Sequence, residues 1–155
     1  MSEITIRYAE SDADVIAIHA FLCIVAGPRL PAEIDPKDSA TEVWRVAHQE
    51  VAIMAMREDK LIGTIGLVCP SFWWNSKVKF LVNRWAFAIP GAGAWKPLLR
   101  EARQIGVSSN MEVHIISEER GSILILNKHA NREQPNPHFA PFPVAEQIGA
   151  RATAH

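Results

Sequence analysis

The chain has 155 residues, enough for a single domain with a sizeable hydrophobic core. Lysine and arginine total 16 and aspartate and glutamate total 17, so the net charge is −1 and the basic excess of dedicated nucleic-acid binders is absent. No apolar run approaches the ~18 residues of a membrane-spanning helix, and the first residues do not have the pattern of a signal peptide. We therefore expect a cytoplasmic protein that binds neither nucleic acid nor membrane.

The cysteines and histidines exclude two further classes. Two cysteines, Cys23 and Cys69, are too few for a disulfide framework, and their apolar sequence surroundings predict buried thiols in a reducing compartment. The six histidines show no metal-ligand spacing with them, so we expect no metal site.

The first half of the chain predicts a strand, two helices and a hairpin. Residues 4–8 alternate as a strand does, and Ser11 and Asp14 have the spacing of a helix N-terminus. Apolar residues continue at helical spacing until Gly27-Pro28, which we expect to end the helix. Further predicted elements are a loop over 28–37, a helix over 39–49, and strands over 51–56 and 61–68 joined by a charged turn.

The second half predicts a long strand followed by a turn and a helix. The predicted elements are a loop over 70–77, a strand over 78–89, a turn over 90–94, a helix from 95 to about 104 ended by Gly106, and a strand over 111–117. Residues 122–128 are apolar but do not indicate one type of element. From residue 131 onward, prolines are dense enough to predict an extended or partly disordered segment. We expect one domain over 1–130, a proline-rich tail over 131–155, and an α/β (α+β) fold with a mixed sheet.

Four segments, in this order, carry a resemblance to a known family. They are residues 4–7 with Asp14 and the apolar helix, the charged turn and apolar-apolar-Gly triplet of 57–63, the strand and terminal proline of 83–90, and the Gly-containing turn and helix of 91–102. Together they resemble the GNAT family of acyl-CoA-dependent N-acetyltransferases over roughly residues 3–117. The resemblance implies a mostly antiparallel sheet flanked by helices. Because only 38 residues follow Ser117, we expect a reduced C-terminal half and, to cover an edge strand, a homodimer.

The turn after the long strand departs from the family motif Arg/Gln-x-x-Gly-x-Gly/Ala. Counting back from Leu98 places Gly93 at the first glycine, Trp95 at the second small residue and Pro90 at the Arg/Gln position. Counting forward from Pro90 instead leaves the loop about three residues short. By either count the turn is abbreviated. The tyrosine that the family commonly uses to protonate the thiolate is also missing, because the only tyrosine is Tyr8.

The resemblance implies acetyl-CoA, or coenzyme A, as cosubstrate. A helix N-terminus holds phosphates through free backbone amides and its dipole, and glycines let the backbone approach an anion. The residues expected to bind the pyrophosphate are Gly91, Ala92, Gly93, Ala94, Trp95 and Lys96. In the family, a backbone amide of the central strand polarises the thioester carbonyl, which by position implicates Ala86, Phe87 and Ala88.

The acceptor amine must lose a proton, and several side chains are candidates for the base. Glu50, His48 and His114 are of the right chemical type, and Ser117 is positioned to hold a water or contact pantetheine. Trp73 and Trp74 are candidates for a substrate pocket or a partner patch, with local packing as the alternative.

The resulting hypothesis is an N-acyltransferase that moves acetyl from acetyl-CoA to a primary amine, on a small molecule or a protein, by direct attack in a ternary complex. The alternative is a catalytically inactive GNAT-fold binding or structural protein of phage or mobile-element origin. A third hypothesis is a small regulatory dimer without a cofactor.

Overall fold

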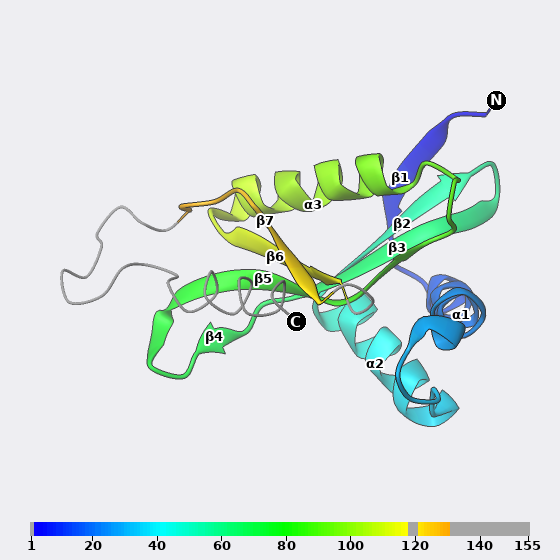
Figure 1. Ribbon diagram of the computed structural model, residues 1–155, viewed down its shortest axis with the longest axis horizontal. Coiled ribbons are helices and arrows are strands. Elements are labelled where there is room, and N and C mark those ends of the chain that lie inside the picture. The colour runs from blue at the N-terminus through cyan, green and yellow to red at the C-terminus, as the bar shows by residue number, and fades with distance from the viewer. Residues whose placement is uncertain (1, 118–120, 131–155) are drawn as a thin grey trace. The chain divides into compact units, whose positions relative to one another are not determined.

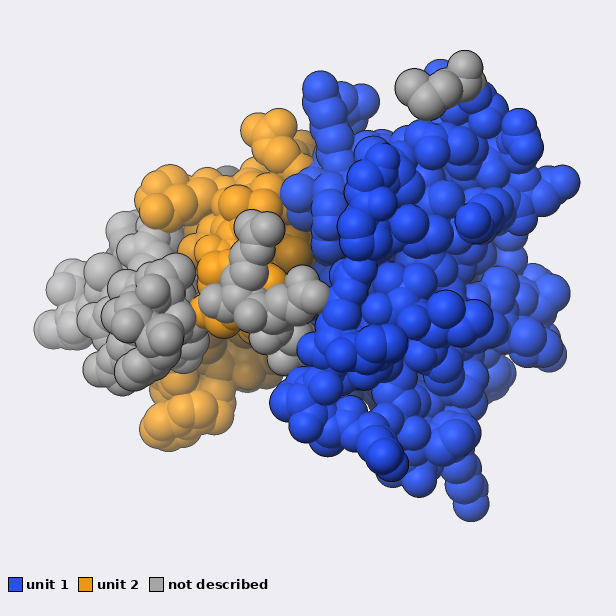
Figure 2. Space-filling view, turned by 45° about the vertical axis from the view of Figure 1, so that its right-hand side comes forward, with its two compact units in different colours: residues 1–68, 83–101 blue, residues 69–82, 102–155 orange. Residues whose placement is uncertain are grey.

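The computed structural model describes residues 2–117 and 121–130, which belong to two compact units (Figure 2). Unit 1 consists of residues 1–68 and 83–101, and unit 2 consists of residues 69–82 and 102–155. Each unit is described by itself below. The predicted proline-rich tail, 131–155, lies outside the described residues.

The strands form the mixed, mostly antiparallel sheet that the sequence predicts (Figure 1). Hydrogen-bonded neighbours follow the order β1-β2-β3-β5-β6-β7, and β4 pairs with β5. The β5–β6 pairing is parallel, whereas β1–β2, β2–β3, β4–β5 and β6–β7 are antiparallel. The bounds are β1 Ile4–Tyr8, β2 Val51–Arg57, β3 Lys60–Val68, β4 Ser71–Phe72, β5 Asn75–Ala88, β6 Glu112–Ser117 and β7 Ser122–Leu126.

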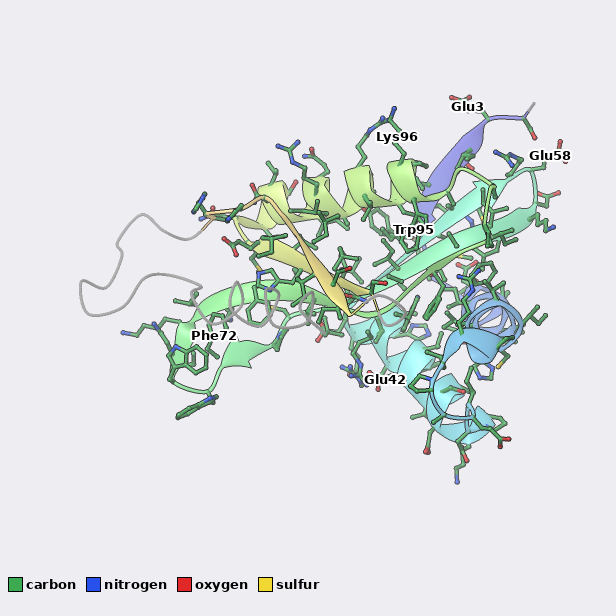
Figure 3. All side chains as sticks on the ribbon, viewed as in Figure 1. Glu3, Glu42, Glu58, Phe72, Trp95 and Lys96 are labelled. Atoms are coloured by element: carbon green, nitrogen blue, oxygen red, sulfur yellow. The ribbon has the colours of Figure 1, made fainter. Side chains whose placement is uncertain are left out.

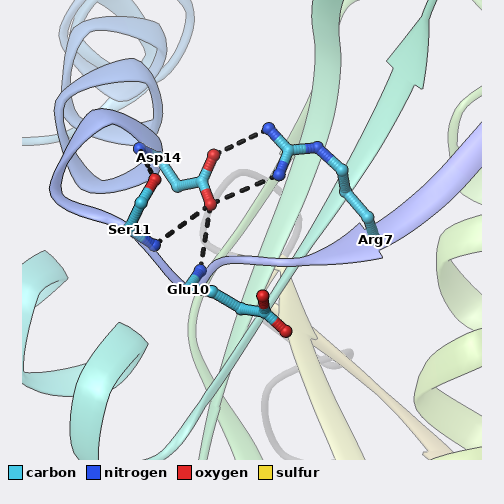
Figure 4. Close-up of polar contacts among 4 residues, drawn as sticks. All are labelled: Arg7, Glu10, Ser11 and Asp14. Atoms are coloured by element: carbon cyan, nitrogen blue, oxygen red, sulfur yellow. Dashed lines mark hydrogen bonds and ion pairs between the residues drawn. The ribbon is translucent and has the colours of Figure 1, made fainter.

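Helix α1, Asp12–Phe21, begins at the predicted cap, which is closed by reciprocal hydrogen bonds (Figure 4). Ser11 Oγ accepts from the Asp14 amide at 3.2 Å, and the buried Asp14 carboxylate accepts from the amides of Glu10 and Ser11 at 2.9 and 3.3 Å. The Arg7 guanidinium adds an ion pair at 2.7 Å. Burial opposes ionisation of Asp14, but Arg7 and the two amides outweigh it and lower its pKa to about 2.

Two predicted helix boundaries near α1 are wrong. Gly27-Pro28 does not end the helical path, because a π-helical segment, Leu22–Ala26, and a 3₁₀ turn, Gly27–Arg29, continue it. Helix α2, Pro36–Gln49, begins three residues before the predicted start. Asp35 caps it by accepting from the amides of Lys37 and Asp38, and Pro36 fits the first helical position because its missing amide would have no partner there.

Helix α3, Trp95–Ser109, extends past the predicted stop at Gly106. A Cβ at Gly106 would lie 2.7 Å from Val113 Cγ2 and 2.8 Å from the Met111 carbonyl oxygen, so only glycine fits between the helix and the start of β6. The helix ends instead where Asn110 takes a left-handed conformation with φ 52°.

The sheet of unit 1 has helices on both faces (Figure 1). Cross-strand pairs Ile53↔Ile65 and Ala55↔Gly63 lie on the face covered by the first turns of α3. The alternate residues Ala52, Met54 and Met56 join the core under α1 and α2. This core also contains Trp85 and Phe87 of β5.

Trp85 lies flat against a glycine in the neighbouring strand. A Cβ at Gly66 would be 2.6 Å from three atoms of the Trp85 ring. The indole Nε1 donates to Thr64 Oγ1 at 3.0 Å, and that buried hydroxyl donates to the Ile53 carbonyl at 2.8 Å. The polar atoms of the Trp85–Thr64 pair are therefore satisfied inside the core.

In unit 2, one segment differs from its prediction, and the segment that the sequence left open is a strand. The predicted loop 70–77 contains β4 and the start of β5, which form a hairpin. Stacked aromatic rings stabilise it, with centroids 4.6 Å apart for Phe72–Trp74 and 4.8 Å apart for Phe72–Phe80. The apolar residues after 121 form β7, which pairs with β6.

Cys23 is exposed, which makes its predicted burial wrong, and Cys69 is half-buried. Cys23 follows the start of the π-helical segment, whose wider turn changes which side chains face the core. Both thiols are free. Among the described residues, no helix combines the length and apolar character needed to cross a membrane.

Candidate functional site

The second part of β5 carries the residues expected to face the thioester. Phe80–Val82 of β5, in unit 2, are paired with β6. The next residues of β5, 83–88, belong to unit 1 and come after the paired stretch. Phe87 and Ala88 are buried, and Ala86 is half-buried. The Ile89 amide donates to the Ile62 carbonyl at 2.9 Å, so this part of the chain is held beside β3 up to the turn.

The turn from Pro90 to Ala94 depends on two glycines with left-handed backbone. Gly91 has φ 77° and Gly93 has φ 79°, conformations that other residues adopt only with strain. The Ala92 amide donates to the Ile89 carbonyl at 3.2 Å, which closes the turn. The predicted Gly-containing turn is thus present, and it leads directly into α3.

A third glycine positions the start of α3. A Cβ at Gly63 of β3 would lie 2.8 Å from Leu98 Cδ1, 2.9 Å from Ala94 Cβ and 3.2 Å from Ala88 Cβ. Only glycine lets the end of β5 and the first turn of α3 approach β3 this closely. The apolar-apolar-Gly triplet identified in the sequence therefore fixes where the turn lies.

The N-terminus of α3 has no side-chain cap. The first helical hydrogen bond runs from the Leu98 amide to the Ala94 carbonyl at 3.1 Å, and Ala94 has no side-chain oxygen. Within the described part of the chain, the amides of Gly93, Ala94, Trp95 and Lys96 have no acceptor. Trp95 and Lys96 are exposed at this helix end (Figure 3). Four amides and a helix dipole make this end suited to an anion.

Arg57, at the end of β2, is a residue of the site that the sequence interpretation missed. Its Nη2 donates to the Ala92 carbonyl at 2.8 Å, a contact between positions 35 residues apart. Its Nε is buried and has no acceptor among the described residues. The charged turn that follows β2 was visible in the sequence, but nothing local indicated that Arg57 reaches the turn before α3.

His114, on β6 in unit 2, is buried and held by two neighbours. Its Nε2 lies 3.1 Å from Glu112 Oε1, and its ring stacks on Phe80 with centroids 4.8 Å apart. Glu112 is fully buried, and its Oε2 accepts from the His129 amide at 2.6 Å. A carboxylate that orients a histidine is an arrangement that catalytic bases use. Glu112 was not singled out from the sequence, because a strand pattern does not reveal a buried charge.

Ser117, Glu50 and His48 each have local surroundings of their own within their unit. Ser117 lies three residues from His114 on the same strand, which places the two side chains on opposite faces of β6. Glu50 is half-buried in unit 1, at the end of α2, with Arg45 Nη1 3.9 Å from its carboxylate. His48 lies 3.5 Å from Asp12 and packs against Trp44. Neither unit therefore contains all of the predicted catalytic residues.

Two further ionisable groups in unit 1 are engaged in local contacts. Glu42, labelled in Figure 3, pairs with Arg45 at 2.6 Å and Arg84 at 3.0 Å, and the Arg45 hydrogen bond is the main cause of its lowered pKa. A carboxylate stabilised in this way is a poor proton acceptor. The Tyr8 hydroxyl hydrogen-bonds Glu101 of α3, and burial together with that carboxylate raises the pKa of Tyr8 to about 12.

Comparison with known proteins agrees with this architecture. No family model and no curated protein matches the chain. A solved structure described as a possible acetyltransferase from Clostridium difficile 630 matches with a TM-score of 0.60 and 19% identity, over 74% of this chain and 78% of that one. A GNAT family acetyltransferase from Staphylococcus aureus matches with a TM-score of 0.55 and 20% identity, over 76% and 87%.

The same fold also carries a different description. A structure described as a transcriptional regulator from Bacillus halodurans C-125 matches with a TM-score of 0.59 and 11% identity, over 74% of this chain and 81% of that one. No group of three or more His, Cys, Asp or Glu residues suited to a metal occurs within residues 2–117 and 121–130. The strand order, the Gly-containing turn before α3 and these structural matches together show that the chain has the fold of the GNAT family of acetyltransferases.

Proposed function

We propose that the protein is an N-acyltransferase that transfers acetyl from acetyl-CoA to a primary amine by direct attack within a ternary complex. The observation that carries this proposal is the uncapped N-terminus of α3 directly after the Gly91–Gly93 turn, in a chain with the GNAT fold. Fold alone does not determine function, so the argument depends on this local chemistry.

The residues of the turn fit the phosphates of coenzyme A. The amides of Gly93, Ala94, Trp95 and Lys96 lack acceptors within the described chain, and a Cβ at Gly91 would meet no atom within 4 Å. These four amides would bind the phosphates, with Gly91 and Ala92 shaping the turn. The Arg57 guanidinium, which donates to the Ala92 carbonyl, would hold that turn in place. When bound, acetyl-CoA supplies an acetyl group activated as a thioester.

The chain's own residues would supply the remaining steps. Backbone amides within Ala86–Ala88 would donate to the carbonyl oxygen and stabilise negative charge on it. His114, oriented by Glu112, is the proposed base that removes a proton from the amine, and Glu50 is the alternative base. Ser117 would hold a water or contact the pantetheine arm. The homodimer and the cytoplasmic location expected from the sequence remain predictions.

The second candidate function is a GNAT-fold binding protein without catalysis. Two observations favour it: the turn before α3 is shorter than the family motif, and the only tyrosine is engaged by Glu101. A thiolate is a good leaving group even without a dedicated acid, so the second observation alone does not exclude transfer.

Thermal unfolding with coenzyme A, acetyl-CoA and pantetheine tests the proposal. A ligand at ~100 times its Kd stabilises by about 2.7 kcal/mol, which for this length is a rise in Tm of about 5–10 °C. We expect a rise with coenzyme A and acetyl-CoA and a much smaller rise with pantetheine, which lacks the phosphates. Amine-dependent release of free thiol would then establish transfer. Binding without release of thiol would favour the second candidate function. An unchanged Tm with millimolar coenzyme A and with millimolar acetyl-CoA would refute binding of either compound.

A further inference from the structure

Arg57 is the last residue of β2 and is paired with both neighbouring strands. Its backbone pairs with Ile4 of β1 on one side and Lys60 of β3 on the other, so the origin of its side chain is fixed by the sheet. From there the guanidinium reaches the turn before α3 and donates from Nη2 to the Ala92 carbonyl at 2.8 Å. Within the described chain, no other group donates to that carbonyl.

This contact determines which way the neighbouring amide points. The carbonyl of Ala92 and the amide of Gly93 belong to one trans peptide, in which C=O and N–H point in opposite directions. Because Arg57 holds the carbonyl toward β2, the Gly93 N–H is directed away from Arg57. Glycines with φ 77° and 79° stand on either side of Ala92, so the local backbone offers little resistance to rotation of this peptide.

Arg57 also supplies a charge that the turn itself lacks. The family motif begins with Arg or Gln, and residues 90–94 of this chain contain neither. The Arg57 guanidinium is half-buried, and its buried Nε has no acceptor among the described residues. A cation held at this place favours an anion nearby through its charge, without a direct contact between the guanidinium and the phosphates.

We propose that Arg57 is a positioning residue for the phosphate-binding turn, which locks the Ala92–Gly93 peptide with the Gly93 amide available to the phosphates and replaces the arginine missing from the shortened motif. This inference rests on the proposed function. Strand β2 then contributes to cofactor binding through its last residue, Arg57, which the sequence of the turn does not reveal.

The test compares coenzyme A binding, measured by calorimetry, among Arg57→Met, Arg57→Lys and Lys60→Met. Lys60 is the register partner of Arg57 and is exposed, so Lys60→Met removes the same charge from the same hairpin without altering a contact to Ala92. We expect Arg57→Met to raise the Kd at least about tenfold, since a hydrogen bond to a charged group is lost. Lys60→Met should change it less than about twofold, and Arg57→Lys, which keeps a charged donor, should recover part of the affinity.

The outcomes separate this inference from the proposed function. Binding is measured at a temperature where melting curves without ligand show each variant folded, and Arg57→Lys against wild type carries the test if Arg57→Met does not fold. An unchanged Kd in folded Arg57 variants would overturn the positioning role and leave the proposed function intact. An equal rise in Kd for Arg57→Met and Lys60→Met would do the same, because it would show only an effect of charge. Absence of binding by the wild-type protein would instead overturn the proposed function itself.

Discussion

The N-termini of α1 and α3 lie in the same unit and are built in opposite ways. At α1, Ser11 and Asp14 accept from backbone amides, and Arg7 holds the carboxylate in place (Figure 4). At α3, alanine stands at the cap position, and the nearby amides have no acceptor within the described residues. Helix α2 is closed like α1, by Asp35.

The difference indicates which helix end is available for a ligand. A side-chain cap satisfies the amides that would otherwise bind an anion, so α1 and α2 have a stabilised end and no free site. At α3 the third helical position is Pro97, which has no amide, so the free donors are concentrated in Gly93 to Lys96. One helix end of this unit is thus built for stability and another is available for binding, and three comparisons of variants test this difference.

The largest expected effect is at the closed end. Asp14→Asn replaces a buried carboxylate that accepts from two amides and Arg7, so we expect a loss of about 3 kcal/mol in the free energy of unfolding at pH 7. Because the folded pKa is about 2 and the ordinary pKa of an aspartate is 3.8, the contribution of the carboxylate is present above about pH 4 and is lost as the pH falls toward 2. Urea unfolding of both proteins at pH 7, 4, 3 and 2 measures this.

The matched control for that prediction is Asp12→Asn in the same helical turn. The Asp12 side chain is 84% exposed, so we expect its free energy of unfolding to change by less than about 1 kcal/mol. A wild-type advantage over Asp14→Asn that stayed constant down to pH 2 would show that the carboxylate charge does not stabilise the cap.

At the open end, Gly93→Asp and Gly93→Asn form a pair that differs only in charge. Both impose the same strain at φ 79°, which Asp and Asn tolerate better than most residues. We expect Gly93→Asp to bind coenzyme A about tenfold more weakly than Gly93→Asn, because its carboxylate would lie beside the phosphates. Equal Kd values from calorimetry would remove the turn from the binding site.

The smallest expected effect comes from closing the open end. Ala94→Ser introduces an oxygen at the cap position, where it can accept from the Lys96 amide, since Pro97 has none. We expect the unliganded protein to gain roughly 0.5–1 kcal/mol and the Kd for coenzyme A to rise about threefold. Ala20→Ser, at an exposed position of α1, is the control. A stabilised variant with unchanged Kd would mean that the Lys96 amide does not contact the ligand.

Local signals in the sequence were sufficient for several elements and for the turn before α3. The Ser11–Asp14 cap, the hairpin around residues 57–60 and the turn containing Gly91 and Gly93 each depend on residues close together in the chain, and each is present. The start of α2 was missed because three prolines in 28–37 indicated a loop, although Pro36 occupies a position where a helix accepts proline.

The missed features depend on contacts between distant residues. Gly106 was interpreted as a helix stop, but its role is to let α3 pack against Val113, which no local pattern contains. Arg57 reaches a turn 35 residues away, and Glu112 is buried against His114 and the His129 amide. For the same reason, the sequence suggested individual catalytic candidates but gave no basis for grouping them.

The contact between Gly66 and Trp85 has a consequence for how this chain can evolve. A methyl group at position 66 would overlap the indole ring at 2.6 Å, and the ring is also tethered by Thr64. Position 66 therefore cannot gain a side chain while Trp85 is present, and descendants that acquire one should carry a smaller residue at 85. The order of the two replacements then matters: a smaller residue at 85 must come first, because a side chain at 66 beside Trp85 would disrupt the core.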